Sequence, residues 1–74
     1  MELEFDNVKY IGKNTNRGLT KGNFYDIIVK KPKKSYTYQI FTYINEEKQI
    51  MEVYSSKNSI QKNWKIDLID LTND

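Results

Sequence analysis

The fold is decided by one stretch of the sequence, Tyr36-Thr37-Tyr38-Gln39-Ile40-Phe41-Thr42-Tyr43-Ile44, with Asn45-Glu46-Glu47-Lys48 and Gln49-Ile50-Met51-Glu52-Val53-Tyr54 directly after it. Every one of the first nine residues except Gln39 is β-branched or aromatic, which favours a strand. The four polar residues that follow suit a hairpin built on a type I turn, and the last six alternate as a return strand. The sequence therefore predicts a β-hairpin over residues 36–54.

Further strands are predicted upstream of this hairpin. Phe24–Lys31 is rich in aromatic and β-branched residues and ends at a proline, and Val8–Ile11 reads as a strand that Gly12 stops. Between them lies a polar loop of about ten residues, 13–22. Residues 2–7 alternate acidic and apolar side chains and suit a short strand or an ordered arm.

Downstream of the hairpin, residues 55–63 are polar around Ile60 and suit a loop or a short helical turn, and Trp64–Leu71 alternates as a last strand. No long stretch has the apolar period of a helix. We therefore predict an all-β chain in which five short strands form a small barrel, because closure removes exposed sheet edges. The chain has 74 residues, so we expect one domain over 1–74.

The order of these elements resembles that of an SH3-like barrel (Src-homology-3), with one helical turn at Lys57–Asn63 before the last strand. Leu19-Thr20-Lys21-Gly22-Asn23-Phe24-Tyr25 resembles the turn that such barrels use after their long first loop. At that turn the glycine permits a positive φ and the leucine folds back onto the core.

Residues 8–13, Val-Lys-Tyr-Ile-Gly-Lys, followed by the Gly18–Tyr25 stretch, also look like the opening of small uncharacterised barrel proteins of low-GC Gram-positive bacteria and their prophages. This resemblance covers roughly residues 8–71 and implies a phage or prophage accessory protein with no shared catalytic signature. Peptide-binding SH3 domains place acidic residues in the first long loop, whereas residues 13–22 here contain Lys13, Arg17 and Lys21 and no acid.

The composition excludes several kinds of chemistry. The chain has no cysteine and no histidine, which removes disulfides, thiol catalysis and the usual proton shuttle. Neither a calcium-loop spacing nor a glycine-rich phosphate loop is present, and the adjacent Glu46 and Glu47 belong to a polar turn. We therefore expect no catalytic residue, no metal, no cofactor and no enzymatic activity.

Six tyrosines are more than so small a core is expected to hide, so some should lie at the surface together with Trp64. Surface tyrosine and tryptophan are favoured in binding sites. We expect a protein-binding patch between the first and second loops, made of Tyr10, Tyr36, Tyr38 and Trp64. Covering the open ends of the barrel is the alternative role for these rings.

A basic cluster surrounds Pro32 and consists of Lys30, Lys31, Lys33 and Lys34, with Tyr36 and Tyr38 just after it. Lysines next to aromatic rings suit a phosphate backbone and stacked bases. A solvated loop that protects a strand edge is the plainer interpretation of the same residues.

The leading hypothesis is a non-enzymatic module that binds a host or phage protein, and the alternative is a nucleic-acid-binding barrel that uses the Lys30–Lys34 loop. The net charge is +2 and the longest apolar runs are three residues, so we expect no contact with a membrane. With no leader-type segment or disulfide framework, a cytoplasmic monomer or weak homodimer is expected.

Overall fold

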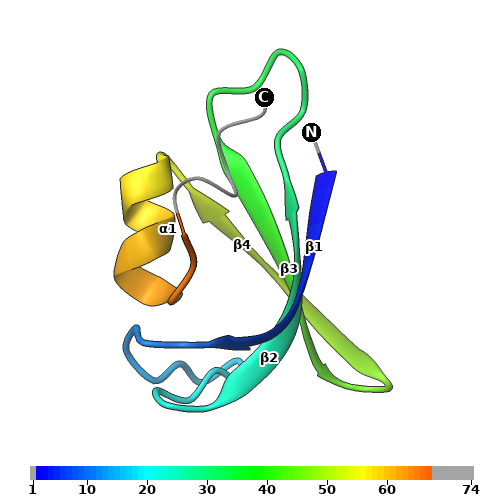
Figure 1. Cartoon of the computed structure of the whole chain (residues 1–74). Helices are drawn as coiled ribbons and strands as arrows, with labels where there is room; N and C mark the ends of the chain where they lie inside the picture. Colours follow the sequence, from blue (N-terminus) through cyan, green and yellow to red (C-terminus); the bar gives the residue numbers. More distant parts are fainter. Residues whose placement is uncertain (1, 68–74) are drawn as a thin grey trace.

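The computed structural model describes residues 2–67, and over this part of the chain the architecture is a four-stranded antiparallel sheet followed by one short helix (Figure 1). The elements are β1 (Glu2–Lys9), β2 (Phe24–Lys30), β3 (Tyr38–Asn45), β4 (Lys48–Tyr54) and α1 (Lys57–Asn63). The strands lie in the order β1-β2-β3-β4. The predicted all-β class is confirmed. Over residues 2–67 the sheet is not closed, so the five-stranded barrel is not confirmed.

The predicted hairpin is β3 and β4. Its register pairs Tyr38 with Tyr54 and Phe41 with Met51, and only Glu46 and Glu47 lie outside the strands. The side-chain oxygen of Asn45 accepts the Glu47 backbone N–H at 2.9 Å, so an Asn side chain closes a turn that is tighter than the four residues predicted.

Strand β1 is longer than the predicted strand Val8–Ile11, because the preceding acidic and apolar residues pair with β2 as well. A bulge between Phe5 and Val8 joins the two parts. Asn7 has a φ of 58° there and donates its backbone N–H to the Asp26 carboxylate at 2.9 Å. Asparagine tolerates this conformation better than most residues, and the bulge bends the strand, as Figure 1 shows.

The long loop between β1 and β2 closes on itself at its base. Tyr10 and Asn23 are joined by a backbone hydrogen bond of 2.8 Å, and the Gly22 N–H donates to the Tyr10 carbonyl at 2.8 Å. Gly22 has a φ of 94°, and Leu19 is fully buried. Both features were predicted from the Leu19–Tyr25 stretch, and both are confirmed.

The predicted last strand is present only at its start. Trp64 forms an isolated antiparallel bridge to Tyr10, and the Lys65 N–H donates to the Lys9 carbonyl at 3.0 Å. Residues 65–67 are not in a strand, and residues 68–71 of the prediction lie outside the described part. The turn predicted at Lys57–Asn63 is α1, which begins where the Ser56 hydroxyl accepts the Ser59 N–H at 3.1 Å.

Aromatic rings fill much of the core. Trp64 is fully buried, with its ring edge-on to Tyr10 at 5.0 Å and to Tyr25 at 6.0 Å between centroids. The other buried hydrophobic residues of the described part are aliphatic or aromatic side chains of the sheet, the first loop and α1: Val8, Leu19, Ile27, Val29, Tyr38, Ile40, Ile50, Tyr54 and Ile60. Many domains of this size depend on a disulfide or a bound metal for stability. Here the large rings stabilise the fold by burying apolar area.

Candidate functional site: a tyrosine and lysine cleft

The predicted aromatic patch does not exist as a surface. Tyr10, Tyr38 and Trp64 are exposed by 3%, 5% and 0%, so the expectation that these three lie at the surface is wrong. Of the four predicted residues, only Tyr36 is exposed, by 92%. The structure thus brings Tyr10 and Trp64 together, but inside the core.

Burial of these rings is possible because their polar atoms have partners. The Tyr10 hydroxyl donates to the Lys13 carbonyl at 2.7 Å, and the Trp64 Nε1–H donates to the Tyr54 hydroxyl at 3.0 Å. Tyr54 in turn donates to Glu52 Oε1 at 3.0 Å. Burial, followed by the nearby Glu52 carboxylate, raises the pKa of both Tyr10 and Tyr54 above the ordinary tyrosine value. These hydroxyls stay neutral and serve packing.

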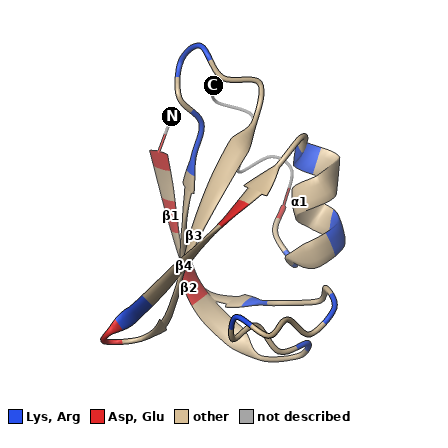
Figure 2. Cartoon of the chain, turned by 180° about the vertical axis from the view of Figure 1, so that it is seen from behind, with Lys and Arg blue, Asp and Glu red and all other residues tan. Residues whose placement is uncertain are grey.

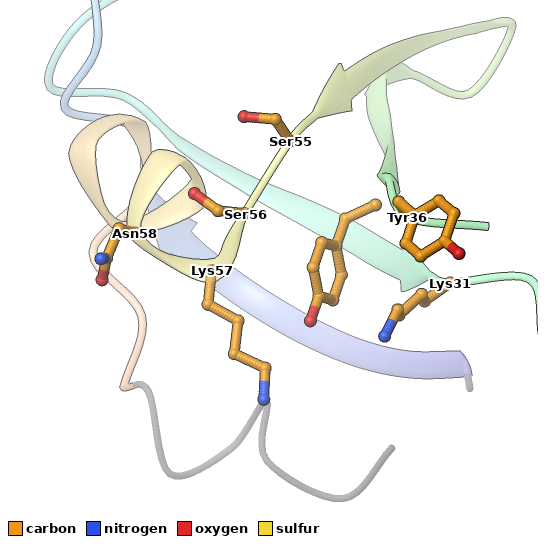
Figure 3. Close-up of a pocket in the computed structure, with 7 residues that line it drawn as sticks. Lys31, Tyr36, Ser55, Ser56, Lys57 and Asn58 are labelled. Atoms are coloured by element: carbon orange, nitrogen blue, oxygen red, sulfur yellow. The ribbon is translucent and has the colours of Figure 1, made fainter.

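A cleft of about 470 Å³ lies between the β2–β3 loop and the beginning of α1, and we call it the Tyr36 cleft. Its lining comes from both sides: Lys31, Tyr36, Tyr38, Ser55, Ser56, Lys57 and Asn58. Figure 3 shows Lys31 and Tyr36 on one wall and Ser56 and Lys57 on the other. Its volume falls within the range of small-ligand pockets.

The β2–β3 loop holds Tyr36 in place through the residues on either side of it. The Ser35 hydroxyl accepts the Thr37 backbone N–H at 3.1 Å and lies 2.9 Å from the Thr37 hydroxyl. The Ser35 N–H donates to the Pro32 carbonyl at 3.0 Å, which closes the turn that precedes Tyr36. Local bonds of this kind fix a backbone turn, so the exposed ring projects from an ordered loop.

The four lysines of the predicted basic cluster do not form one patch. Lys30 lies on the outer face of the sheet. Its Nζ is 3.5 Å from Glu2 Oε1 and 4.9 Å from the centre of the Phe41 ring. Lys31 points to the opposite side, where its ammonium is 5.4 Å from the centre of the Tyr38 ring. Successive residues of a strand face opposite sides, and Lys31 directly follows β2, so these two lysines separate.

Lys33 and Lys34 lie at the exposed tip of the β2–β3 loop. Figure 2 shows lysines on this loop and on α1 across from it. Three of the four predicted lysines, Lys31, Lys33 and Lys34, therefore belong to the loop that forms one wall of the cleft. Lys30 belongs elsewhere.

Sequence reasoning missed the second wall of the cleft, which consists of Ser55, Ser56, Lys57 and Asn58. The hairpin register contained the signal. Tyr38 pairs with Tyr54 in this antiparallel hairpin. Two residues beyond that pair, Tyr36 on one side therefore comes opposite Ser56 on the other. Extending the pairing past the strand ends would have placed α1 beside the tyrosine.

The outer sheet face is a second surface, and we define it by Ile28, Phe41, Tyr43, Met51 and Val53. Phe41 pairs with Ile28 on one side and with Met51 on the other. Tyr43, Met51 and Val53 are exposed by 45%, 39% and 57%. The apolar side chains therefore form a stripe across three strands on the side opposite the core.

Comparison of the chain with protein-family models, curated proteins and solved structures found no match. The resemblance to SH3-like barrels therefore still depends on the residues quoted above. Among the described residues, no helix has the length and apolar character needed to cross a membrane.

Proposed function

We propose that this protein is a non-enzymatic binding module, and that its binding surface is the Tyr36 cleft, where it holds an anionic partner. The observation that carries the proposal is the Tyr36 ring, which is 92% exposed on an ordered loop, in a cleft whose two walls each carry a lysine. A tyrosine presented in this way offers a large, rigid contact area at low entropic cost, which suits a binding site.

The lysines give the cleft its preference for negative charge. Lys31 and Lys57 come from opposite walls, and Lys33 and Lys34 extend the basic loop beyond the cleft. Lysine ammonium groups bind phosphate or carboxylate groups as point charges. An anionic partner would therefore contact the ring and the ammonium groups at the same time.

Site-specific photo-cross-linking tests the location of the site without assuming the class of partner. A photoreactive phenylalanine derivative replaces Tyr36 in cells of a low-GC Gram-positive bacterium, and the control carries it at Glu47 in the β3–β4 turn. We expect adducts at position 36 that are lost in the background of Lys31→Glu and Lys57→Glu, and few adducts at position 47. Equal adducts at both positions, or none at position 36, would overturn the proposal.

A protein of host or phage origin, the leading class of partner from the sequence, is the second candidate. It is supported by the apolar stripe of the outer sheet face, since contiguous exposed apolar patches mark interaction sites. The same cross-linker at Val53 tests it: a protein adduct at position 53 that disappears in Met51→Glu supports this second surface, and a Val53 variant that yields no adduct argues against it.

The SH3-like barrel and the prophage origin are also proposals. The bridge between Tyr10 and Trp64 supports the barrel, because it brings the start of the predicted last strand next to the end of β1, as closure requires. A paramagnetic or NMR restraint set that pairs residues 65–70 with β1 would establish it, and the absence of such pairing would refute it.

A further inference from the structure

We infer that the ligand of the Tyr36 cleft is a single-stranded nucleic acid, with one unpaired base stacked on the Tyr36 ring and neighbouring phosphates held by Lys31 and Lys57. The inference rests on the proposed function of the cleft and specifies its ligand. Three features of the cleft carry it: the accessible ring, the placement of the lysines and the position of the ring at the edge of the cleft.

The first feature is that, of the two described rings that line the cleft, Tyr36 is the one with an open face. Tyr38 is 5% exposed, and the Lys31 ammonium lies 5.4 Å from the centre of its ring. Tyr38 therefore forms the floor of the cleft and orients Lys31. A base that enters can stack on Tyr36, and such stacking is sequence-tolerant because every base has a π-face.

The second feature is that each wall of the cleft supplies a lysine. Lys31 precedes Tyr36 on the same loop, and Lys57 approaches from α1 (Figure 3). A nucleic-acid strand carries a phosphate on each side of every internal nucleotide, so a cleft with a lysine on each wall and one exposed ring suits a strand whose base stacks there. An acidic peptide would contact the lysines and leave the exposed ring face without a flat partner.

The third feature is that the Tyr36 ring, 92% exposed, projects into solvent at the edge of the cleft, where a base can reach its face. A paired base in a duplex shows only its edge in a groove, whereas stacking on a side chain requires an unpaired base. Ser56 is already engaged, because its hydroxyl accepts the Ser59 N–H and lies 3.0 Å from the Ser59 hydroxyl. Ser55 and Asn58 are the exposed polar residues of this wall.

The test is fluorescence anisotropy with labelled oligo(dT) and oligo(rU) of about 15 nucleotides, a length typical of small β-domain sites. A duplex of equal length and a poly-glutamate peptide are the competitors. We expect binding in the range of about 1–100 µM, as for non-specific contacts. If Lys31 and Lys57 each neutralise one phosphate, affinity for the single strands falls about sevenfold between about 50 and 200 mM salt.

Matched variants separate stacking from charge. Tyr36→Leu should weaken binding about tenfold or more, whereas Tyr36→Phe keeps the ring and should bind like the parent. Lys31→Gln and Lys57→Gln should each reduce the slope of log affinity against log salt concentration by about 0.7, the value for one phosphate contact on a single strand. Lys48→Gln, at the other end of β4, makes the same charge change away from the cleft and should leave binding unchanged.

Several outcomes would overturn the inference: no binding of either oligonucleotide at low salt, equal binding by Tyr36→Leu, or poly-glutamate that competes as well as the oligonucleotides. The last result would identify an acidic protein segment as the ligand. The cross-linking experiment distinguishes the two levels. Adducts at position 36 that contain only protein overturn the nucleic-acid ligand and leave the binding module intact, whereas no preference for position 36 overturns both.

Discussion

Two regions of this small domain use tyrosine in opposite ways. Around Trp64, the rings of Tyr10, Tyr25 and Tyr54 are packed together and their hydroxyls are hydrogen-bonded. At the cleft, Tyr36 is almost fully exposed, although the loop that carries it is ordered by hydrogen bonds on either side. The difference is whether polar partners lie within reach of the hydroxyl. It teaches that an excess of tyrosine does not by itself imply surface rings.

The largest expected effect is at the centre of the buried cluster. Trp64→Ala removes the largest fully buried side chain and leaves the Tyr54 hydroxyl without its donor. Losing so large a side chain costs about 3–5 kcal/mol, about as much as a core of this size supplies. We expect a chain that is unfolded at 25 °C by circular dichroism and by NMR dispersion. A cooperative thermal transition in the variant would contradict the central role of Trp64.

A smaller change probes the hydrogen bonds of the same cluster. Tyr54→Phe keeps the ring but leaves the Trp64 Nε1–H without its acceptor and removes a donor to Glu52. A buried donor without a partner costs about 1–3 kcal/mol. Urea unfolding should show this loss in the free energy of unfolding with the slope unchanged. An unchanged midpoint would mean that another group or water satisfies the indole.

The buried hydroxyls also predict how stability depends on alkaline pH. The pKa of Tyr54 is raised above 10.0, so above pH 10 the unfolded chain releases a proton that the folded chain keeps. Stability is therefore fully present below pH 10 and falls as the pH rises, by about 1.4 kcal/mol per pH unit for one such group. Tyr10 adds to this loss in the same direction. Urea unfolding between pH 9 and pH 11 should show a shallower decline for Tyr54→Phe.

The comparison also shows what the sequence could predict. The hairpin, Leu19, Gly22 and the helical turn followed from local patterns, because alternation, turn residues and glycine conformation are local properties. The burial of Tyr10 did not, because its hydroxyl partner is the Lys13 backbone carbonyl, whose position depends on the folded first loop.

Only one wall of the candidate site was predictable from the sequence. Tyr36 and the loop lysines are visible in the sequence, whereas the α1 wall required the register of Tyr38 with Tyr54. The separation of Lys30 from Lys31 was also available, since a strand that reaches Lys31 must send these two side chains to opposite faces. The fully buried Trp64 was missed because alternation shows which residues share a face and not how deeply the face is covered.

A gain in stability is expected at Thr42, which is fully buried and pairs with Ile27 and Ile50 in the sheet. Among the described residues its Oγ1 is a buried side-chain atom without a hydrogen-bond partner. Thr42→Val replaces this hydroxyl by a methyl group of similar size and should stabilise the fold by about 1 kcal/mol. Thr42→Ser, which keeps the hydroxyl and loses the methyl group, should instead destabilise it. Chemical denaturation of both variants measures these changes in the free energy of unfolding. A loss of stability in Thr42→Val would mean that the hydroxyl has a partner.

The smallest expected effect on stability is at Tyr36. Its ring is exposed by 92%, so Tyr36→Leu should change the free energy of unfolding by no more than about 0.5 kcal/mol, as is usual for surface positions. A large loss of stability would mean that the ring packs in the folded protein, and the contrast with the Trp64 cluster would then disappear. If Tyr36→Leu leaves the fold unchanged and weakens oligonucleotide binding, the two uses of tyrosine are separated, since Tyr36 then serves only the partner and the rings around Trp64 only the core.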